Sequence, residues 1–219
     1  MTISNLTKCQ GAFRLHIPYL SLVPGKVYGI VGPNGCGKST LLKILGGLTF
    51  SDTGTIDREG LTPGQITLLP QKPYLMRDTV LANLTYPLTL RKIKPDQGVI
   101  NQYLHLAGLT HLRGAFAPGL SSGEGQKLAL IRALIFNPKL ILMDETFSNM
   151  DMESQLAFEA HMLEKQQSAP ITWLIISHQF ATIQRLCDHI LYMENGQLIE
   201  DGPSPSLARF LDCRAPRQQ

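Results

Sequence analysis

One nine-residue stretch restricts the possible folds of this chain more than any other feature. Residues 32–40 read GPNGCGKST and fit the pattern G-x-x-x-x-G-K-[ST]. Glycines in this stretch lack a Cβ atom, so the backbone can curl tightly and direct several N–H groups at one anion. Lys38 adds a positive charge, and the Ser39 hydroxyl can ligate Mg²⁺. The stretch predicts a cradle for nucleotide phosphates, with these candidate contacts: Gly32, Pro33, Asn34, Gly35, Cys36, Gly37, Lys38, Ser39 and Thr40.

The residues on either side of this loop agree with that interpretation. Val27–Val31 is a short apolar run typical of a buried strand, and Leu41–Leu45 has the apolar spacing of a helix. A strand, a glycine-rich loop and a helix N-terminus together place backbone donors around a phosphate. A glycine-rich turn that matched the pattern by accident would have no reason to lie between such a strand and such a helix.

Length and composition narrow the classes of protein. A chain of 219 residues with 43% hydrophobic residues can bury a full core, and we expect one domain. The formal net charge of +3, without a long basic run, gives no support for a nucleic-acid partner. No apolar stretch reaches the roughly 20 residues needed to span a bilayer, and the N-terminus lacks the form of a signal peptide. We therefore expect a cytoplasmic protein. The four cysteines form no C-x-x-C pair, so neither a metal site nor a disulfide framework is indicated.

Several short strands are expected outside the loop. Ile3–Lys8 and Phe13–Ile17 alternate apolar and polar residues, and we expect Pro18 to mark the end of the second strand. Further strands are expected at residues 54–56 and 66–69, and a hairpin at Asn195–Gly196.

Residues 73–137 differ in character from the rest of the chain. Their apolar residues have mainly helical periodicity, which Pro87 and Pro95 are expected to interrupt. We interpret this segment as a helical lobe inserted between two parts of an α/β core.

Two continuously apolar runs end in residues that can carry chemistry. Leu140–Met143 is followed by Asp144 and Glu145, and Ile171–Ile176 is followed closely by His178. Such runs are typical of parallel strands that are covered on both faces. A carboxylate at the end of a buried strand can be held rigidly beside a metal ion.

Five features of the sequence now stand in a fixed order: the phosphate loop, Gln71, the run Ser121–Gln126, the pair Asp144–Glu145, and His178. Together they resemble the nucleotide-binding subunit of ABC transporters over nearly the whole chain. The resemblance implies a P-loop NTPase (RecA-like) α/β core with N-terminal antiparallel β-strands and an inserted helical lobe. It implies a single domain over residues 1–212 and a tail at 213–219. The core lobe would take residues 1–72 and 138–212, and the helical lobe 73–137.

The same resemblance implies roles for the polar residues around the loop. Asp144, Ser39 and Gln71 would contact Mg²⁺. Glu145 would be the general base that polarises the attacking water. His178 would contact the γ-phosphate, and Gln71 would also lie near the attacking water, at the hinge between the lobes. ATP and Mg²⁺ are the implied cofactors.

Ser121, Ser122 and Gly123 resemble the ABC signature sequence, which in that family binds the nucleotide of the other protomer. Ser121 is also expected to cap a long helix, whose N-terminus suits an anion. The resemblance therefore implies a head-to-tail dimer of two copies with two ATP molecules at the interface. Residues 148–151 resemble the segment that crosses this interface.

Three departures from the family pattern are visible. Ser122 stands where a glycine is usual, and Thr146 where a proline is usual. The family also stacks an aromatic ring on adenine, and the corresponding place lies near Cys9–Gln10, with Phe13 close by. We expect reduced efficiency at most from Ser122, and weaker binding of adenine where no aromatic ring stacks on it.

The leading hypothesis is an ATPase that powers a transporter through separate transmembrane permease subunits. It would lie in the cytoplasm, peripherally on the inner face of the plasma membrane. Its docking groove is expected between the lobes and would include Tyr74, Leu75 and Met76. The overall layout, especially residues 70–75 and 183–188, is similar to ATPases of bacterial importers for small oxyanions such as tungstate. This resemblance implies a periplasmic binding protein as an indirect partner.

A soluble ABC ATPase that acts in assembly stays open as the alternative. A small GTPase or nucleotide kinase shares only the phosphate loop, and the sequence lacks an Asn-Lys-x-Asp guanine motif.

Overall fold

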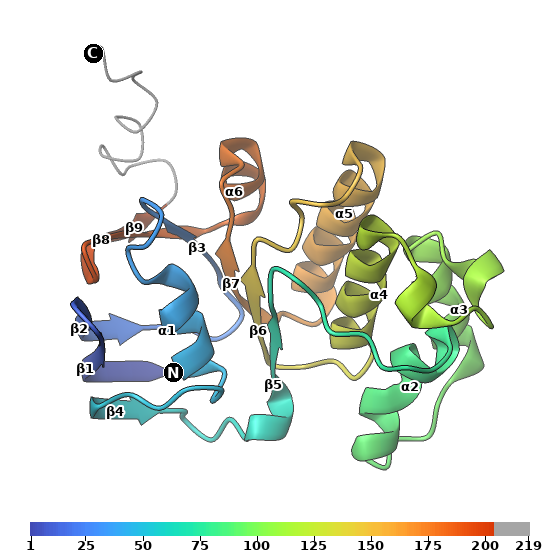
Figure 1. The fold of residues 1–219 in the computed structure, drawn as a ribbon, viewed down its shortest axis with the longest axis horizontal. Helices are drawn as coiled ribbons and strands as arrows, with labels where there is room; N and C mark the ends of the chain where they lie inside the picture. The colour runs from blue at the N-terminus through green and yellow to red at the C-terminus, as the bar shows by residue number, and fades with distance from the viewer. Residues whose placement is uncertain (204–219) are drawn as a thin grey trace.

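The computed structural model describes residues 1–203, which form one curled nine-stranded sheet with helices packed on it (Figure 1). The strand order across this sheet is β4-β1-β2-β9-β8-β3-β7-β6-β5. The strands are β1 (Thr2–Gln10), β2 (Phe13–Ser21), β3 (Val27–Val31), β4 (Thr53–Asp57), β5 (Ile66–Leu69), β6 (Leu140–Asp144), β7 (Thr172–Ile176), β8 (His189–Glu194) and β9 (Gln197–Pro203). The helices are α1 (Lys38–Leu45), α2 (Val80–Leu90), α3 (Gln97–Leu106), α4 (Ser122–Leu134), α5 (Met152–Ser168) and α6 (Phe180–Leu186), with short 3₁₀ turns at Pro63–Gln65, Thr110–Leu112 and Ala117–Gly119.

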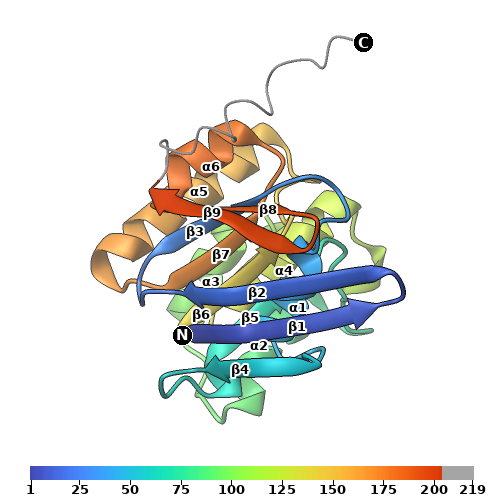
Figure 2. The ribbon, with the colours of Figure 1, turned by 90° about the vertical axis from the view of Figure 1, so that its left-hand side faces the viewer.

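The sheet has an antiparallel part and a parallel part. Strands β1, β2 and β4 pair antiparallel in front of the core, as Figure 2 shows. Strands β8, β3, β7, β6 and β5 pair parallel. The predicted P-loop α/β core with N-terminal antiparallel strands is therefore confirmed. The proposed domain end at residue 212 and the tail lie outside the described residues.

The expectation that Pro18 marks the end of the second strand was wrong, because β2 continues to Ser21. The pairing of β1 with β2 passes from Ser4–Tyr19 to Leu6–Ile17 and skips Pro18. The ladder therefore omits the position at which proline has no N–H to donate.

Strands β3, β6 and β7 are buried on both faces, as their continuous apolar runs predicted. One face packs against α1 and the N-terminal strands through Tyr28, Ile30, Leu140, Leu142, Leu174 and Ile176. The other packs against α4, α5 and α6 through Val27, Val31, Ile141, Met143, Trp173 and Ile175. Because successive side chains of a strand point to opposite faces, the two clusters alternate along each strand. The strand ends are thereby fixed from both sides.

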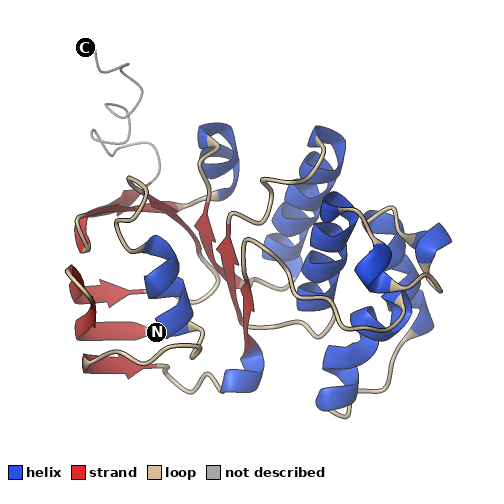
Figure 3. Cartoon of the chain, in the orientation of Figure 1, coloured by secondary structure: helices blue, strands red, loops and turns tan. Residues whose placement is uncertain are grey.

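Three of the helices, α2, α3 and α4, come from residues 73–137 and gather at one end of the molecule (Figure 3). Pro95 lies between α2 and α3 as expected, but Pro87 lies inside α2, so the prediction of an interruption there was wrong. Its ring is buried, its carbonyl accepts a bond from Arg91 Nη1 at 3.1 Å, and the helix continues only to Leu90. Among residues 1–203, no helix combines the length and apolar character that a membrane crossing needs.

The predicted hairpin at Asn195–Gly196 joins the antiparallel part of the sheet to the phosphate loop. Both residues have positive φ, 48° and 79°, as a tight two-residue turn requires. The Gly196 carbonyl accepts from His16 N at 2.6 Å, and Gly196 N donates to Cys36 O at 3.2 Å. The turn therefore connects β2 with the loop.

We predict that Gly196→Ala destabilises the chain far more than Gly11→Ala. Both glycines have positive φ, but a Cβ at Gly196 would overlap Arg14 O at 2.0 Å, whereas a Cβ at Gly11 would meet nothing within 4 Å. In urea unfolding, Gly11→Ala should cost about 1 kcal/mol from backbone strain, and Gly196→Ala about 3 kcal/mol or more from the added clash. Equal losses would contradict this account of the turn.

Candidate functional site

The four polar segments predicted to form the site lie at one edge of the sheet. The phosphate loop follows β3, Gln71 follows β5, Asp144 ends β6 with Glu145 directly after it, and His178 follows β7. The register aligns the ends of these strands, since Ile176 pairs with Ile30 and with Asp144. Parallel strands present their carboxyl ends at the same edge of a sheet, which is where ligands bind in α/β folds.

The phosphate loop is held in a conformation that only glycine can adopt at key positions. Gly37 is the N-cap of α1 with φ 104°. A Cβ at Gly32 would overlap the carbonyl oxygen of Met193. Lys38 is in the first turn of α1, and its Nζ donates to Gly32 O at 2.8 Å and to Pro33 O at 2.9 Å. The ammonium is therefore held within the loop.

The Cys36 thiol lies inside the same loop, 3.9 Å from Lys38 Nζ. Burial raises the pKa of this thiol, although the nearby Lys38 charge opposes the shift. A neutral buried thiol is a weak nucleophile, so the structure gives Cys36 no chemical role beyond its backbone.

Asp144 and Ser39 form the oxygen pair expected of a magnesium site. Asp144 is buried at the end of β6, and its side chain is hydrogen-bonded to Ser39. Burial raises the pKa of Asp144, while the Ser39 bond and the lysines Lys43 and Lys38 act in the opposite direction. Mg²⁺ prefers one or two such hard donors together with substrate phosphates. The described residues contain no cluster of three His, Cys, Asp or Glu side chains that would form a protein-only metal cage.

Gln71, Glu145 and His178 come together although they are far apart in sequence. Gln71 Nε2 donates to Glu145 Oε2 at 2.9 Å, and His178 Nε2 lies 2.9 Å from Glu145 Oε1. Glu145 has a positive φ of 50°, which is uncommon for a residue with a side chain. Its carbonyl accepts from Ser148 Oγ at 2.8 Å, and its N–H donates to Ile176 O at 3.0 Å. The carboxylate is thus fixed between two polar side chains.

A cavity of 670 Å³ extends from the phosphate loop to this group. It is also lined by Gln10 and Phe13, at the end of β1 and the start of β2. A Cβ at Gly37 would lie 2.8 Å from Phe13 Cζ, so the ring is against the loop. The lining residues are Gln10, Phe13, Asn34, Gly35, Gly37, Lys38, Ser39, Thr40, Gln71, Glu145 and His178.

The Ser121 run does not line this cavity. Ser121 caps α4 as predicted, because Glu124 N donates to its Oγ at 3.3 Å and its own hydroxyl donates to Glu124 Oε2 at 2.7 Å. This bond lowers the pKa of Glu124. Ser121 and Ser122 are exposed, and a Cβ at Gly123 would lie 3.0 Å from Asn149 O. The run therefore packs against residues 148–151, with its two serines facing solvent.

Sequence reasoning missed the contacts that fix residues 148–151. Asp151 caps α5 by accepting from Ser154 N at 2.8 Å, and this bond lowers the pKa of Asp151. Lys127 of α4 lies 3.6 Å from Asp151 and donates to Ser154 Oγ at 3.3 Å. An aspartate directly before the helical segment, with Glu153 in its first turn, was the available signal for this cap.

A glycine loop between buried β3 and α1, with a carboxylate pair at the carboxyl end of β6, two strands away in the same sheet, defines a P-loop nucleoside triphosphatase. The family model described as ABC transporter matches residues 15–148. The chain belongs to the ABC transporter family.

Individual relatives agree with this assignment. The chain is 36% identical over 208 residues to the tungstate uptake system ATP-binding protein TupC of Peptoclostridium acidaminophilum, covering 91% of this chain and 97% of that protein. It is 30% identical over 220 residues to a probable sulfate/thiosulfate import ATP-binding protein CysA of Chlorella vulgaris, covering 94% of this chain and 92% of that protein.

Solved structures also match the fold. A nucleotide-free ATP-binding cassette from an ABC transporter superposes with a TM-score of 0.73 at 30% identity, covering 92% of this chain and 90% of that chain. A dimeric ATP-binding cassette in a post-hydrolysis state, bound to ADP and Pi, superposes with a TM-score of 0.80 at 22% identity, covering 94% of this chain and 100% of that chain. The chain is therefore an ATP-binding subunit with ATPase activity.

Proposed function

We propose that two copies of this chain power the import of a small oxyanion through separate transmembrane subunits. The ATPase part of the proposal rests on one observation: Gln71 and His178 each lie 2.9 Å from the Glu145 carboxylate, in the same cavity as the phosphate loop. The named functions of the relatives, tungstate uptake and sulfate/thiosulfate import, support the substrate class. The chain would then act on the inner face of the membrane, and a periplasmic binding protein would deliver the solute.

Each residue of the site has a role in this proposal. The loop N–H groups and Lys38 bind the β- and γ-phosphates. Ser39 and Asp144 would hold Mg²⁺, which neutralises charge developing on the phosphates. Glu145 accepts a proton from the attacking water, because its carboxylate is fixed at the end of the cavity. Gln71 would contact Mg²⁺ or the attacking water, and His178 would donate to the γ-phosphate.

The site of one chain is completed by Ser121, Ser122 and Gly123 of a second chain. These residues begin a helix of 13 residues, whose N–H groups and dipole favour an anion. They are not among the residues around their own loop cavity, and the two serines are exposed. A head-to-tail arrangement would bring them to the partner's γ-phosphate, with residues 148–151 crossing the interface.

The departures from the family pattern are compatible with activity. Ser122 points its added side chain to solvent and leaves the α4 cap intact. Thr146 is buried directly after Glu145, and its hydroxyl has no hydrogen-bond partner among the described residues. Phe13 is the aromatic residue at the cavity, so we propose that it contacts adenine, with Gln10 beside it.

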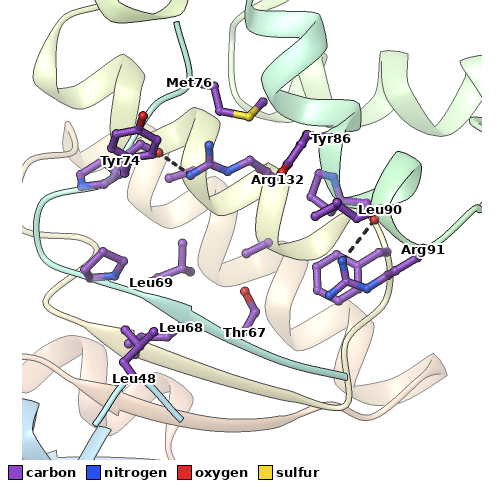
Figure 4. A pocket seen from close by; sticks show the side chains of 16 residues that line it. Leu48, Thr67, Leu68, Leu69, Tyr74, Met76, Tyr86, Leu90, Arg91 and Arg132 are labelled. Carbon is purple, nitrogen blue, oxygen red and sulfur yellow. Dashed lines mark hydrogen bonds between the residues drawn. The ribbon is translucent and has the colours of Figure 1, made fainter. Parts of the chain in front are cut away.

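The transmembrane partner would dock in a groove between β5 and α2 (Figure 4). The groove has a volume of 480 Å³, and its exposed apolar side chains include Leu48, Tyr74 and Leu90, with exposed fractions of 70%, 75% and 61%. Arg132 Nη2 donates to Tyr74 O at 2.7 Å and so connects the two walls. An apolar groove of this form suits a short helix of the partner.

Two of the three expected groove residues are in this lining. Tyr74 and Met76 line it, whereas Leu75 packs against the buried core and lies close to Gly125.

We predict that Glu145→Gln keeps ATP binding but lowers turnover by a factor of about 10² to 10⁴, because the amide cannot accept the proton. With ATP, this variant should elute as a stable dimer in size-exclusion chromatography. Glu153→Gln, an exposed carboxyl on α5, is the matched control and should behave like the unmodified chain. Unchanged turnover of Glu145→Gln would exclude Glu145 as the base.

We predict that Leu90→Glu weakens docking on co-expressed transmembrane subunits about tenfold or more, since a buried charge without a partner is costly. ATPase activity of the isolated chain should stay unchanged. Leu163→Glu places the same charge on an exposed leucine of α5, outside the groove, and should copurify normally. Equal copurification of both variants would place the docking surface elsewhere.

A further inference from the structure

A buried polar network between α5 and α6 lies next to the site but is not part of it. Gln155 and Glu159 come from α5, and Thr182 and Arg185 come from α6. Gln155, Glu159 and Thr182 have exposed fractions of 2%, 3% and 0%. Arg185 binds both carboxylate oxygens of Glu159, with Nε to Oε2 at 2.6 Å and Nη2 to Oε1 at 3.0 Å. The carboxylate is therefore buried and paired.

The network reaches the chain directly after His178. Gln155 Nε2 lies 2.9 Å from Gln179 Oε1, 2.8 Å from Glu159 Oε1 and 2.7 Å from Thr182 Oγ1. Thr182 Oγ1 also lies 3.1 Å from Gln179 Oε1. The Gln179 side chain is thus tied to both helices.

His178 itself depends on such an anchor. Its side chain is 51% exposed, so packing does little to fix it. Its neighbours along the chain form a turn in which Gln179 N donates to Ser177 Oγ at 3.0 Å. The position of the imidazole relative to Glu145 therefore depends on the contacts that fix the turn at residues 177–179.

Burying these polar side chains between α5 and α6 costs free energy of solvation. Packing of the two helices does not require them. Apolar side chains of similar volume would stabilise two packed helices at least as well as a buried ion pair does. Polar networks specify one geometry, because every donor must meet its acceptor. A network that ends on Gln179 is suited to fixing the turn at His178.

We propose that Gln155 and Thr182 are positioning residues for His178. Their bonds to Gln179 Oε1 fix the turn so that the imidazole stays in line with the Glu145 carboxylate and the γ-phosphate. The inference rests on the proposed role of His178 in ATP hydrolysis. Neither positioning residue touches the nucleotide, so their loss should lower the turnover number and leave the apparent affinity for ATP unchanged.

The test uses two matched pairs of variants in the 219-residue chain. Gln155→Leu removes the amide at nearly constant volume, and kcat should fall about tenfold or more while KM for ATP changes less than about twofold. Phe158→Leu, at a fully buried position of the same helix, is the control for lost packing. It should lower the melting temperature without a comparable loss of kcat. A loss of kcat in Phe158→Leu as large as in Gln155→Leu would show a merely structural effect and overturn the proposal.

The second pair isolates one hydroxyl. Thr182→Val should slow turnover, and Thr182→Ser, which keeps the hydroxyl, should restore it. Thr182→Ser as slow as Thr182→Val would overturn the proposal, as would wild-type kcat in Gln155→Leu.

His178→Ala distinguishes the role of His178 in hydrolysis from the positioning role of Gln155 and Thr182. Wild-type turnover in His178→Ala would overturn the role of His178 and with it this inference. A slow His178→Ala together with a fast Gln155→Leu would overturn the positioning role alone.

Discussion

Backbone N–H groups can bind a polyphosphate only if the chain is held in a conformation that places them on one concave surface. That constraint determines the rest of this structure. The loop at residues 32–40 is fixed by β3 on one side, by α1 on the other, and by the turn at Gly196, whose N–H bonds to Cys36 O. A Cβ at Gly32 has no space beside Met193 O, so the loop and β8 are packed at backbone distance. Strand β3, which leads into the loop, is itself paired with a parallel strand on each side, β7 and β8.

Much of the site could be predicted from the positions of its residues at the ends of buried strands. Asp144 and Glu145 end a continuously apolar run, and His178 follows another, so their meeting at one sheet edge could be predicted. The contacts of Gln71 and His178 with the two oxygens of Glu145 could not, because hydrogen bonds between side chains 74 and 33 residues apart leave no local pattern. The same holds for the network of Gln155 with Gln179.

At two prolines, the surrounding tertiary structure overrides the expectation that proline ends a strand or interrupts a helix. Pro18 lies within β2 at a position that the ladder skips, and Pro87 lies in the last turn of α2, where its ring is buried. At Pro18 the missing N–H costs little, because the neighbouring strand β1 makes no pair at that position. Sequence alone does not reveal which neighbour will be there. The glycine turn at Asn195–Gly196 was predictable, since its requirement for positive φ is local.

The central claim is that each chain holds half of each ATPase site. The most direct test mixes two variants that are inactive alone: Lys38→Ala, which removes the loop charge, and Ser122→Asp, which adds a negative charge where the partner's γ-phosphate would bind. An aspartate in the first turn of α4 is favourable for the helix, so the second variant should fold normally. In a head-to-tail heterodimer both defects fall in one site and the other site is intact, so an equal mixture should recover roughly a quarter of the wild-type ATPase rate. No recovery on mixing, in samples shown to exchange subunits, would contradict the shared site.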